Sequence, residues 1–224
     1  MAKNIRTEDF KLENVRLSYP SLLTLKKRVE KNGTVKFNYE AVLLYPKGPP
    51  LTGKSSNGQP LDVVAECIRI ATEHWGEKAV DMIKTELIRN PFKDGDGKDG
   101  LVKKTGEKKP GYEGHKFISV SANEKRQPKC FGSTVGADGK LVELTDPAAL
   151  YPGCYVHAVV NAYTWENDLG GRGISFGVSM VQFAKDGERI GGGGGPSADS
   201  FFEGVVDKGA APAAAAGGAG NLFA

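Results

Sequence analysis

Two neighbouring segments, Cys154–Trp165 and Gly173–Ala184, alternate in character at every second residue and constrain the fold more than any other feature. Successive side chains of a β-strand point to opposite faces, so each segment predicts a long strand with one face directed to a core. The intervening "WENDLGGRG" supplies turn residues, so the two strands are predicted to be antiparallel neighbours. The predicted core-facing residues are Val156, Ala158, Val160, Ala162 and Thr164 in the first strand, and Ile174, Phe176, Val178 and Met180 in the second.

Four further runs are rich in β-branched and aromatic residues and are bounded by turn residues. Between the second and third of them, apolar residues recur at helical spacing through residues 61–90. Residues 92–116 are rich in Lys, Gly and acids and predict a long, mobile loop. The pattern predicts a mainly β fold, a small antiparallel barrel of the OB type with a helical insertion near 61–90. The four additional strands are predicted at Phe10–Tyr19, Lys36–Tyr45, Lys116–Ala122 and Pro128–Ser133.

The composition changes abruptly at Gly191–Pro196, which reads "GGGGGP" and predicts a flexible linker. The sequence beyond it is low-complexity Ala, Gly and Pro, which cannot bury enough apolar surface to fold. We therefore predict a folded nucleic-acid-binding domain at 1–190 and a flexible tail at 191–224. Short segments with larger apolar residues interrupt the tail, and four of these residues are the predicted contacts for a partner protein, namely Phe201, Phe202, Leu222 and Phe223.

The net charge of the chain is +3, which by itself does not indicate nucleic acid. The tail carries three acidic residues and one Lys from Pro196 onward, so the preceding residues carry +5. Three widely separated cysteines suggest neither a disulfide framework nor a zinc site and suit a reducing compartment. The first residues lack the apolar run of a signal peptide, and no apolar stretch approaches the roughly 20 residues of a membrane span. A protein of the cytoplasm is expected.

The segment "GPPLTGKS" at Gly48–Ser55 matches the pattern of a phosphate-binding loop. Pro49 and Pro50 lack the N–H groups that such a loop requires, and "SNGQP" prevents a helix from starting at the Lys-Ser pair. A flexible loop with an exposed Lys54 is therefore favoured. A nucleotide-binding enzyme that uses this loop is nevertheless kept as an alternative function.

The other enzyme-like patterns fail on spacing. A calcium loop that starts at Asp94 would place Lys98 and Thr105 at positions that need oxygen ligands. The histidines are not combined with Cys or carboxylates at metal-ligand spacing, and no nucleophile motif is present. We therefore expect no catalytic residues, no metal and no cofactor. The chain does not resemble an enzyme.

The second face of the Cys154–Trp165 segment is aromatic and polar, with Tyr155, His157, Asn161, Tyr163 and Trp165. One interpretation is a second hydrophobic layer that the helical segment covers. The other is a platform on which unpaired bases stack, since single-strand binders combine aromatic faces with basic residues that follow the backbone. His157 and Asn161 suit a wet groove better than a sealed core, so the platform is favoured.

Short basic runs flank these aromatic strands. "LKKRVEKNGTVKF" includes Lys36, "NEKRQPKCF" includes Arg126 and Lys129 beside Phe131, and Arg172 follows the loop after Trp165. Several basic runs next to aromatic strands are better explained by a polyanion than by a solvated surface. The predicted nucleic-acid-binding residues are Tyr155, His157, Tyr163, Trp165, Arg172, Lys36, Arg126, Lys129 and Phe131.

The segments "FKLENVRLSYPSLL", "KFNYEAVLLYPKG", "HKFISVSANEKRQPKCF", "LYPGCYVHAVVNAYTWEN" and "GRGISFGVSMVQFAKDGERIGGG" together resemble the bacteriophage single-stranded DNA-binding protein family. The resemblance runs in order from about Phe10 to Gly195. It implies an OB-fold with a helical insertion, binding of single-stranded DNA without sequence preference, and a role in phage replication or recombination. The tail departs from many single-strand binders, because it is poor in acids and ends one residue after Phe223. A protein-interaction module remains a second alternative, which salt dependence would separate from DNA binding.

Overall fold

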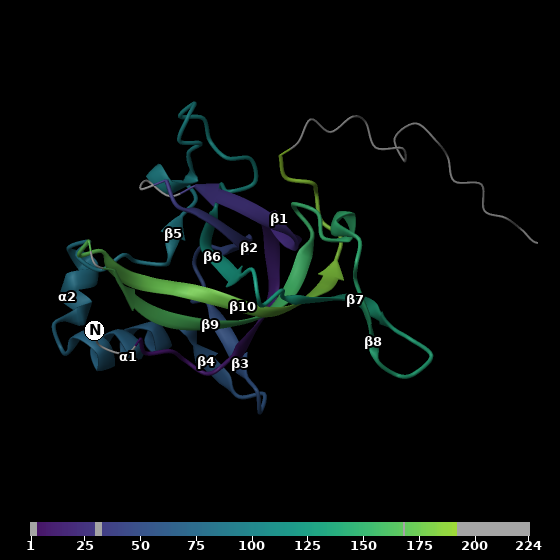
Figure 1. Ribbon diagram of the computed structural model, residues 1–224, viewed down its shortest axis with the longest axis horizontal. Helices are drawn as coiled ribbons and strands as arrows, with labels where there is room; N and C mark the ends of the chain where they lie inside the picture. The colour runs from purple at the N-terminus through teal and green to yellow at the C-terminus, as the bar shows by residue number, and fades with distance from the viewer. Residues whose placement is uncertain (1–3, 30–32, 168, 192–224) are drawn as a thin grey trace, which may run out of the picture. The chain divides into compact units, whose positions relative to one another are not determined.

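The structure is a computed structural model that describes residues 4–29, 33–167 and 169–191 (Figure 1). Half of the described residues between Phe10 and Lys185 are in strands, and two helices stand between the fourth and fifth strands. The strands are β1 (Phe10–Val29), β2 (Val35–Pro46), β3 (Thr52–Ser55), β4 (Pro60–Asp62), β5 (Lys93–Asp94), β6 (His115–Asn123), β7 (Lys129–Val135), β8 (Leu141–Glu143), β9 (Tyr155–Glu166) and β10 (Arg172–Lys185). The helices are α1 (Val63–Trp75) and α2 (Ala79–Lys84), with 3-10 turns at Lys98–Gly100 and Pro147–Ala149.

Five strands close into a barrel. Going around it, β1 pairs with β2, β2 with β6, β6 with β10, β10 with β9, and β9 with β1 again. Every one of these pairs is antiparallel except β6–β10, which is parallel. A closed barrel of five strands is the architecture of the OB-fold, so the predicted fold class is confirmed for the described residues.

The β9–β10 hairpin has the predicted antiparallel pairing, from Trp165 opposite Gly173 to Tyr155 opposite Lys185. The predicted core face of β9 is fully buried. In β10 the alternation changes at a bulge between Val178 and Met180. Met180 was predicted to face the core, but it is 40% exposed and Val181 is buried instead. A bulge adds one residue to a strand and reverses the facing of every residue after it.

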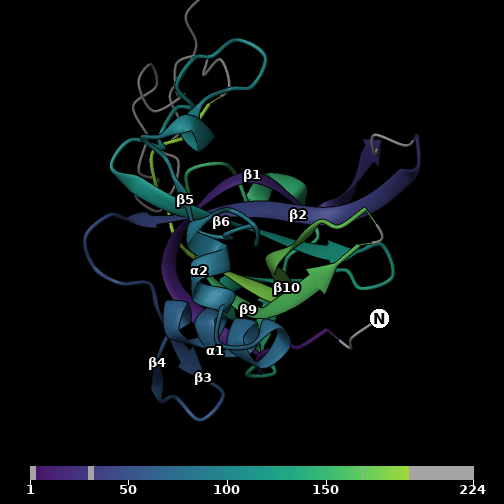
Figure 2. The same ribbon diagram turned by 90° about the vertical axis from the view of Figure 1, so that its left-hand side faces the viewer.

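The pairing of β1 with β2 continues beyond the barrel to Val29 opposite Val35. We call residues 24–29 and 35–38 the β1–β2 arm; it extends away from the barrel at the right of Figure 2. The sequence predicted a strand that ended at Tyr19 and a basic loop after it, and this prediction is wrong. Arg28 lies directly opposite Lys36, so both cations belong to the same face of the arm.

The helical insertion lies where it was predicted. Asp62 starts α1 by accepting hydrogen bonds from Val64 N and Ala65 N at 2.8 and 3.1 Å, as N-cap carboxylates do. Gly76, with a φ of 79°, ends the helix. The second helix is shorter than predicted, because it ends at Lys84 and leaves Leu87 64% exposed.

The segment that matched a phosphate-binding loop forms a small hairpin instead. Lys54 lies in β3, opposite Pro60 of β4 and Lys11 of β1, and its ammonium group lies 2.7 Å from Glu13. Gly53 is needed because a Cβ there would come within 2.8 Å of the Phe10 ring. No helix starts at Lys54, so the geometry of a phosphate-binding loop is absent from this segment.

Residues 92–116 were predicted to be a mobile loop, but they are fixed to the barrel. Tyr112 is 1% exposed and packs edge-on against Phe117, with ring centroids 5.0 Å apart. Asp94 and Asp96 both form ion pairs with Lys47 of the loop after β2. The composition of the segment obscured this because Tyr112 is the one fully buried apolar side chain among many charged residues and glycines.

None of the helices formed by the described residues is long and apolar enough to cross a membrane. The same residues contain no group of three or more His, Cys, Asp or Glu that could hold a metal ion. The predicted tail contacts Phe201, Phe202, Leu222 and Phe223 lie outside the described residues.

Candidate nucleic-acid interface

The outward face of the barrel is small and polar where β2, β6 and β10 meet. On β6, Ser121 lies between Glu40 of β2 and Gly177 of β10. Asn38 and Asn123 form the neighbouring cross-strand pair. Only the Phe176–Val120 and Gly177–Ser121 pairs join β6 to β10, so these two strands diverge on either side of them. The divergence leaves a depression on each side of the junction.

The larger depression is an open cleft of about 890 Å³, which we call the basic cleft. The N-terminal segment, the β1–β2 arm, the start of β2, the β6–β7 loop and the start of β7 each contribute cations to its walls. Among the described lining residues, Asp9 is the one carboxylate. The cationic lining residues are Arg6, Arg28, Lys36, Arg126 and Lys129.

Asp9 holds the floor of the basic cleft together. It accepts a hydrogen bond from Asn161 Nδ2 at 3.0 Å and one from the Ser179 hydroxyl at 3.3 Å. Asn161 is 8% exposed and takes the space above Gly177, where a Cβ would lie 3.1 Å from its amide oxygen. The Asp9 carboxylate also lies 3.7 Å from the Arg6 guanidinium, so it orders two neutral groups and pairs with one of the five cations. The cations still outnumber it among the described lining residues of the cleft.

The N-terminal segment forms one wall because it extends the sheet along β9. Thr7 N donates to Ala162 O at 2.9 Å and Thr164 N donates to Ile5 O at 2.8 Å. Arg6 pairs with Tyr163 in an antiparallel bridge. This pairing fixes the backbone on both sides of Arg6 beside the cleft.

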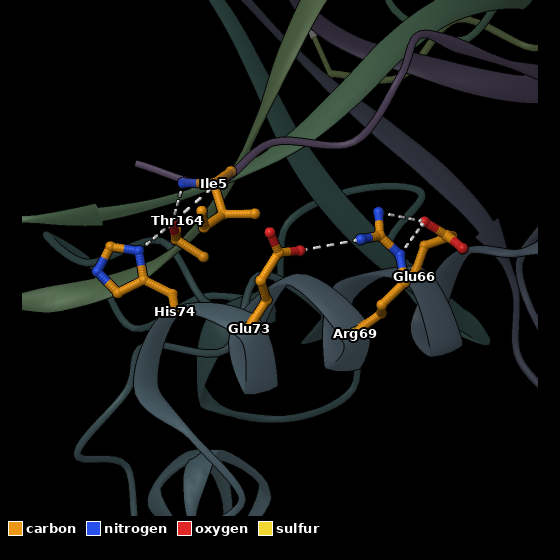
Figure 3. Close-up of polar contacts among 6 residues, drawn as sticks. All are labelled: Ile5, Glu66, Arg69, Glu73, His74 and Thr164. Atoms are coloured by element: carbon orange, nitrogen blue, oxygen red, sulfur yellow. Dashed lines mark hydrogen bonds and ion pairs between the residues drawn. The ribbon is translucent and has the colours of Figure 1, made fainter. Parts of the chain in front are cut away.

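Helix α1 supports the same wall from below, as Figure 3 shows. The Thr164 hydroxyl accepts a hydrogen bond from Ile5 N at 2.9 Å and donates to Ile5 O at 3.2 Å. His74 Nδ1 lies 2.8 Å from the same hydroxyl oxygen, within hydrogen-bond distance. Thr164 is fully buried. The helical insertion is therefore coupled to the N-terminal segment.

The outer surface of α1 carries a cation that is paired with carboxylates of the same helix. Arg69 lies 2.9 Å from Glu66 and 3.2 Å from Glu73, at i−3 and i+4 spacing (Figure 3). The carboxylates raise the pKa of the Arg69 guanidinium, with the hydrogen bond to Glu66 as the largest cause. Its charge is balanced locally, in contrast to the excess of cations around the basic cleft.

A comparison with known proteins shows which family the chain belongs to. The sequence profile of the family described as Enterobacter phage Enc34, ssDNA-binding protein, matches residues 8–211. The chain belongs to this family. The resemblance to phage single-stranded DNA-binding proteins that the sequence suggested is thereby confirmed.

Individual proteins are also similar to this chain. Protein p50 of Acyrthosiphon pisum secondary endosymbiont phage 1 is 31% identical over 196 residues, which are 85% of this chain and 91% of that protein. Among solved structures, the single-stranded DNA-binding protein of bacteriophage Enc34 in complex with ssDNA is 23% identical. The match covers 82% of this chain and 89% of that chain, with a TM-score of 0.48. Gp2.5 of bacteriophage T7, a single-stranded DNA-binding protein, is 12% identical, with coverage of 94% and 99% and a TM-score of 0.45.

In this member of the phage ssDNA-binding protein family, four of the nine predicted binding residues line one cleft. Lys36, Arg126, Lys129 and Tyr163 come from four different elements and meet at the basic cleft. The predicted set did not include Arg6, which lies before the first predicted strand and has no aromatic residue next to it in the sequence. No local pattern in the sequence marks Arg6 as a binding residue, because Arg6 comes to lie beside β9 only in the folded barrel.

Tyr155 and His157 lie elsewhere on β9, beyond the position of the β10 bulge. The Tyr155 ring lies under Lys185, whose Nζ is 4.7 Å from the ring centroid. His157 Nδ1 accepts a hydrogen bond from Asn14 N at 3.3 Å. Burial lowers the pKa of His157, which keeps this acceptor unprotonated. Neither residue lines the basic cleft.

The remaining three predicted residues also lie outside the lining of the basic cleft. Trp165 donates from Nε1 to the Ser175 hydroxyl at 2.9 Å. Arg172 Nε lies 3.9 Å from Glu166 at the start of the hairpin loop. Phe131 pairs with Gln182 of β10 and Glu143 of β8, two positions after Lys129 along β7. The aromatic residues that alternation predicted to share one face of β9 therefore lie in several different environments, and Tyr163 is the one of them that lines the basic cleft.

Proposed function

We propose that this chain binds single-stranded DNA in the basic cleft, without sequence preference and without catalysis. The observation that carries the proposal is the convergence of five cations from separate elements on a small, polar floor. Phosphate neutralisation supplies most of the sequence-independent affinity for nucleic acid. Membership of the phage ssDNA-binding protein family supports the same function.

The cleft offers two kinds of contact. Its Arg and Lys side chains hold phosphates, which carry no sequence information. Tyr163 offers a ring face, on which any base can stack. The floor residues Ser121, Gly177 and Ser179 are small and leave room for sugars and bases near the backbone. These contacts favour binding that is general for unpaired strands.

The biological setting is also part of the proposal, and membership of the phage family supports it. We propose a role in phage DNA replication or recombination in the cytoplasm of the bacterial host, with single-stranded DNA as the partner and no cofactor. Replication or recombination proteins are proposed to bind the tail through Phe201, Phe202, Leu222 and Phe223. We also propose the division into a binding domain at 1–190 and a flexible tail at 191–224.

A titration with fluorescent oligo-dT at two salt concentrations tests the proposed function. We expect tight binding at low salt that weakens steeply as salt rises, because each neutralised phosphate releases counterions. Oligonucleotides of mixed sequence should bind about as tightly as oligo-dT. Binding that does not change with salt would instead favour the protein-interaction alternative. ATP hydrolysis that is lost in Lys54→Ala would favour the nucleotide enzyme.

A further inference from the structure

A second, smaller cleft of about 250 Å³ continues the basic cleft on the other side of the β6–β10 junction. The two clefts share Arg28 of the β1–β2 arm and Ser121 of β6. Its floor consists of the next outward residues along the same strands, among them Val42, Ser119 and Ser175. The two depressions therefore form one continuous path over the barrel.

Residues 88–93, which we call the insertion loop, form the far wall of this second cleft. The insertion loop is fixed to the barrel near both of its ends. Arg89 N donates to Arg172 O at 3.0 Å and Ile174 N donates to Arg89 O at 3.2 Å, so the loop adds a bridge to β10. Ile88 is fully buried, and the Phe92 ring packs edge-on against Phe176 at 5.8 Å. The backbone of Arg89 therefore has a defined position at the cleft.

The charge of the second cleft is also positive. Arg28, Arg89 and Lys93 line it, and Glu40 is the one acidic residue in the described part of its lining. The Glu40 carboxylate is 2.5 Å from the ammonium group of Lys26, which neutralises it. Phosphates that leave the basic cleft would meet a second group of cations along the path.

The second cleft also ends beside an aromatic ring. Trp165 lies against Gly173, where a Cβ would come within 2.8 Å of the indole. The Arg89 guanidinium carbon lies 5.7 Å from the centre of the Trp165 ring, in a cation–π arrangement. An unpaired base can replace the guanidinium on the ring, because both are flat groups that stack on aromatic faces. The displaced guanidinium then remains close enough to bind a phosphate.

We infer that single-stranded DNA runs from the basic cleft into this second cleft, where Arg89 and Lys93 bind phosphate and Trp165 stacks on a base in place of Arg89. This inference rests on the proposed function and assigns a direct DNA-binding role to the helical insertion. It also predicts that the number of nucleotides decides whether the second cleft is used.

The test compares Arg89→Ala/Lys93→Ala with Lys84→Ala/Lys98→Ala, which removes two exposed, ion-paired lysines near the same insertion. Affinity is measured for oligo-dT of about 4 and about 12 nucleotides, which lie within the range of about 4–16 nucleotides that one OB-fold binds. We expect the first variant to bind the longer strand about tenfold more weakly, as the loss of one charge-assisted contact would cause. The shorter strand should bind as in the parent, and the control variant should match the parent for both. Equal affinity of the first variant and the parent for the longer strand would overturn the inference.

Fluorescence provides a second measurement, because the chain has two tryptophans. In Trp75→Phe, Trp165 is the sole reporter, and we expect the longer strand to quench it and the shorter strand to leave it unchanged. Emission that the longer strand does not alter would contradict stacking at Trp165. If that happens while oligo-dT still binds and Arg126→Ala/Lys129→Ala weakens it, only this inference fails. If no oligonucleotide binds, the proposed function fails as well.

Discussion

Thr164 of β9 and His74 of α1 meet at 2.8 Å, and their hydrogen bond couples the helical insertion to the wall of the basic cleft. The same hydroxyl holds both backbone groups of Ile5. Arg6 follows directly and lines the cleft. A buried network in which one hydroxyl serves three groups is sensitive to the loss of that hydroxyl.

Replacing Thr164 by Val should therefore loosen the N-terminal segment. The variant keeps the shape of the side chain but leaves Ile5 N and His74 Nδ1 without their hydroxyl partner, at a cost of about 1–3 kcal/mol in the free energy of unfolding. Ile5 O keeps the hydrogen bond from Thr164 N. Thr164→Ser keeps the hydroxyl and should stay close to the parent in stability. Urea denaturation measures both effects. If Thr164→Val is as stable as Thr164→Ser, the network does not hold the segment.

The charges of the basic cleft should set the salt dependence of binding. Arg126→Ala/Lys129→Ala should weaken binding to all sequences alike, since phosphates carry no sequence information. It should also reduce the slope of log K against log salt by about 1.4, because each phosphate contact to a single strand contributes about 0.7. Lys84→Ala/Lys98→Ala is the matched control and should leave the slope unchanged. A slope that both variants share with the parent would place the DNA backbone elsewhere.

Tyr163 and Tyr155 provide a matched pair on one strand. Both belong to the aromatic set predicted from alternation, but Tyr163 lines the basic cleft and Tyr155 packs under Lys185. Tyr163→Ala should lose about 1–3 kcal/mol of oligo-dT binding, as the removal of a stacking ring does. Tyr155→Ala should retain the parent affinity. Equal losses in the two variants would show that the strand passes over both residues.

The contrast between these tyrosines shows how far the sequence can be interpreted. The period of two in β9 predicts correctly which residues face the core, because that choice is local. It cannot tell whether the outward residues share one surface, because a twisted strand in a barrel turns its two ends in different directions. Tyr155 and Tyr163 are therefore on the same side of the strand and in different surroundings.

The bulge in β10 and the convergence of the cations were also not predictable from local patterns. A bulge is one extra residue, and nothing in "GVSMVQF" marks where the pairing with β9 accommodates it. Arg6 and Lys129 are far apart in sequence and lie at one cleft only because β9 and β10 bring their flanking segments together. The composition of the basic runs indicated a polyanionic ligand, and barrel closure decides which of these residues line the cleft.

The last prediction concerns pH. His157 accepts a hydrogen bond from Asn14 N, and burial lowers its pKa below the ordinary value of 6.5. Glu13 opposes this shift, and Lys11 and Lys54 add to it. As pH falls through 6.5, the unfolded chain takes up a proton at this histidine before the folded protein does. The free energy of unfolding should therefore decrease as pH falls from about 7.5 to about 5.5.

His157→Asn isolates this contribution, because an amide oxygen can accept the hydrogen bond from Asn14 N and does not titrate. The variant should lose less stability than the parent across the same pH range, as measured by urea denaturation at each pH. The pH range ends near 5.5 because protonation of Glu13 in more acidic solution would cause a second loss of stability. The hydrogen bonds from Lys11 and Lys54 lower the pKa of Glu13 from 4.5 to about 2, so its stabilising contribution is lost only as pH falls below about 4.5. An identical pH dependence in the parent and His157→Asn would mean that the folded protein protonates His157 as readily as the unfolded chain does.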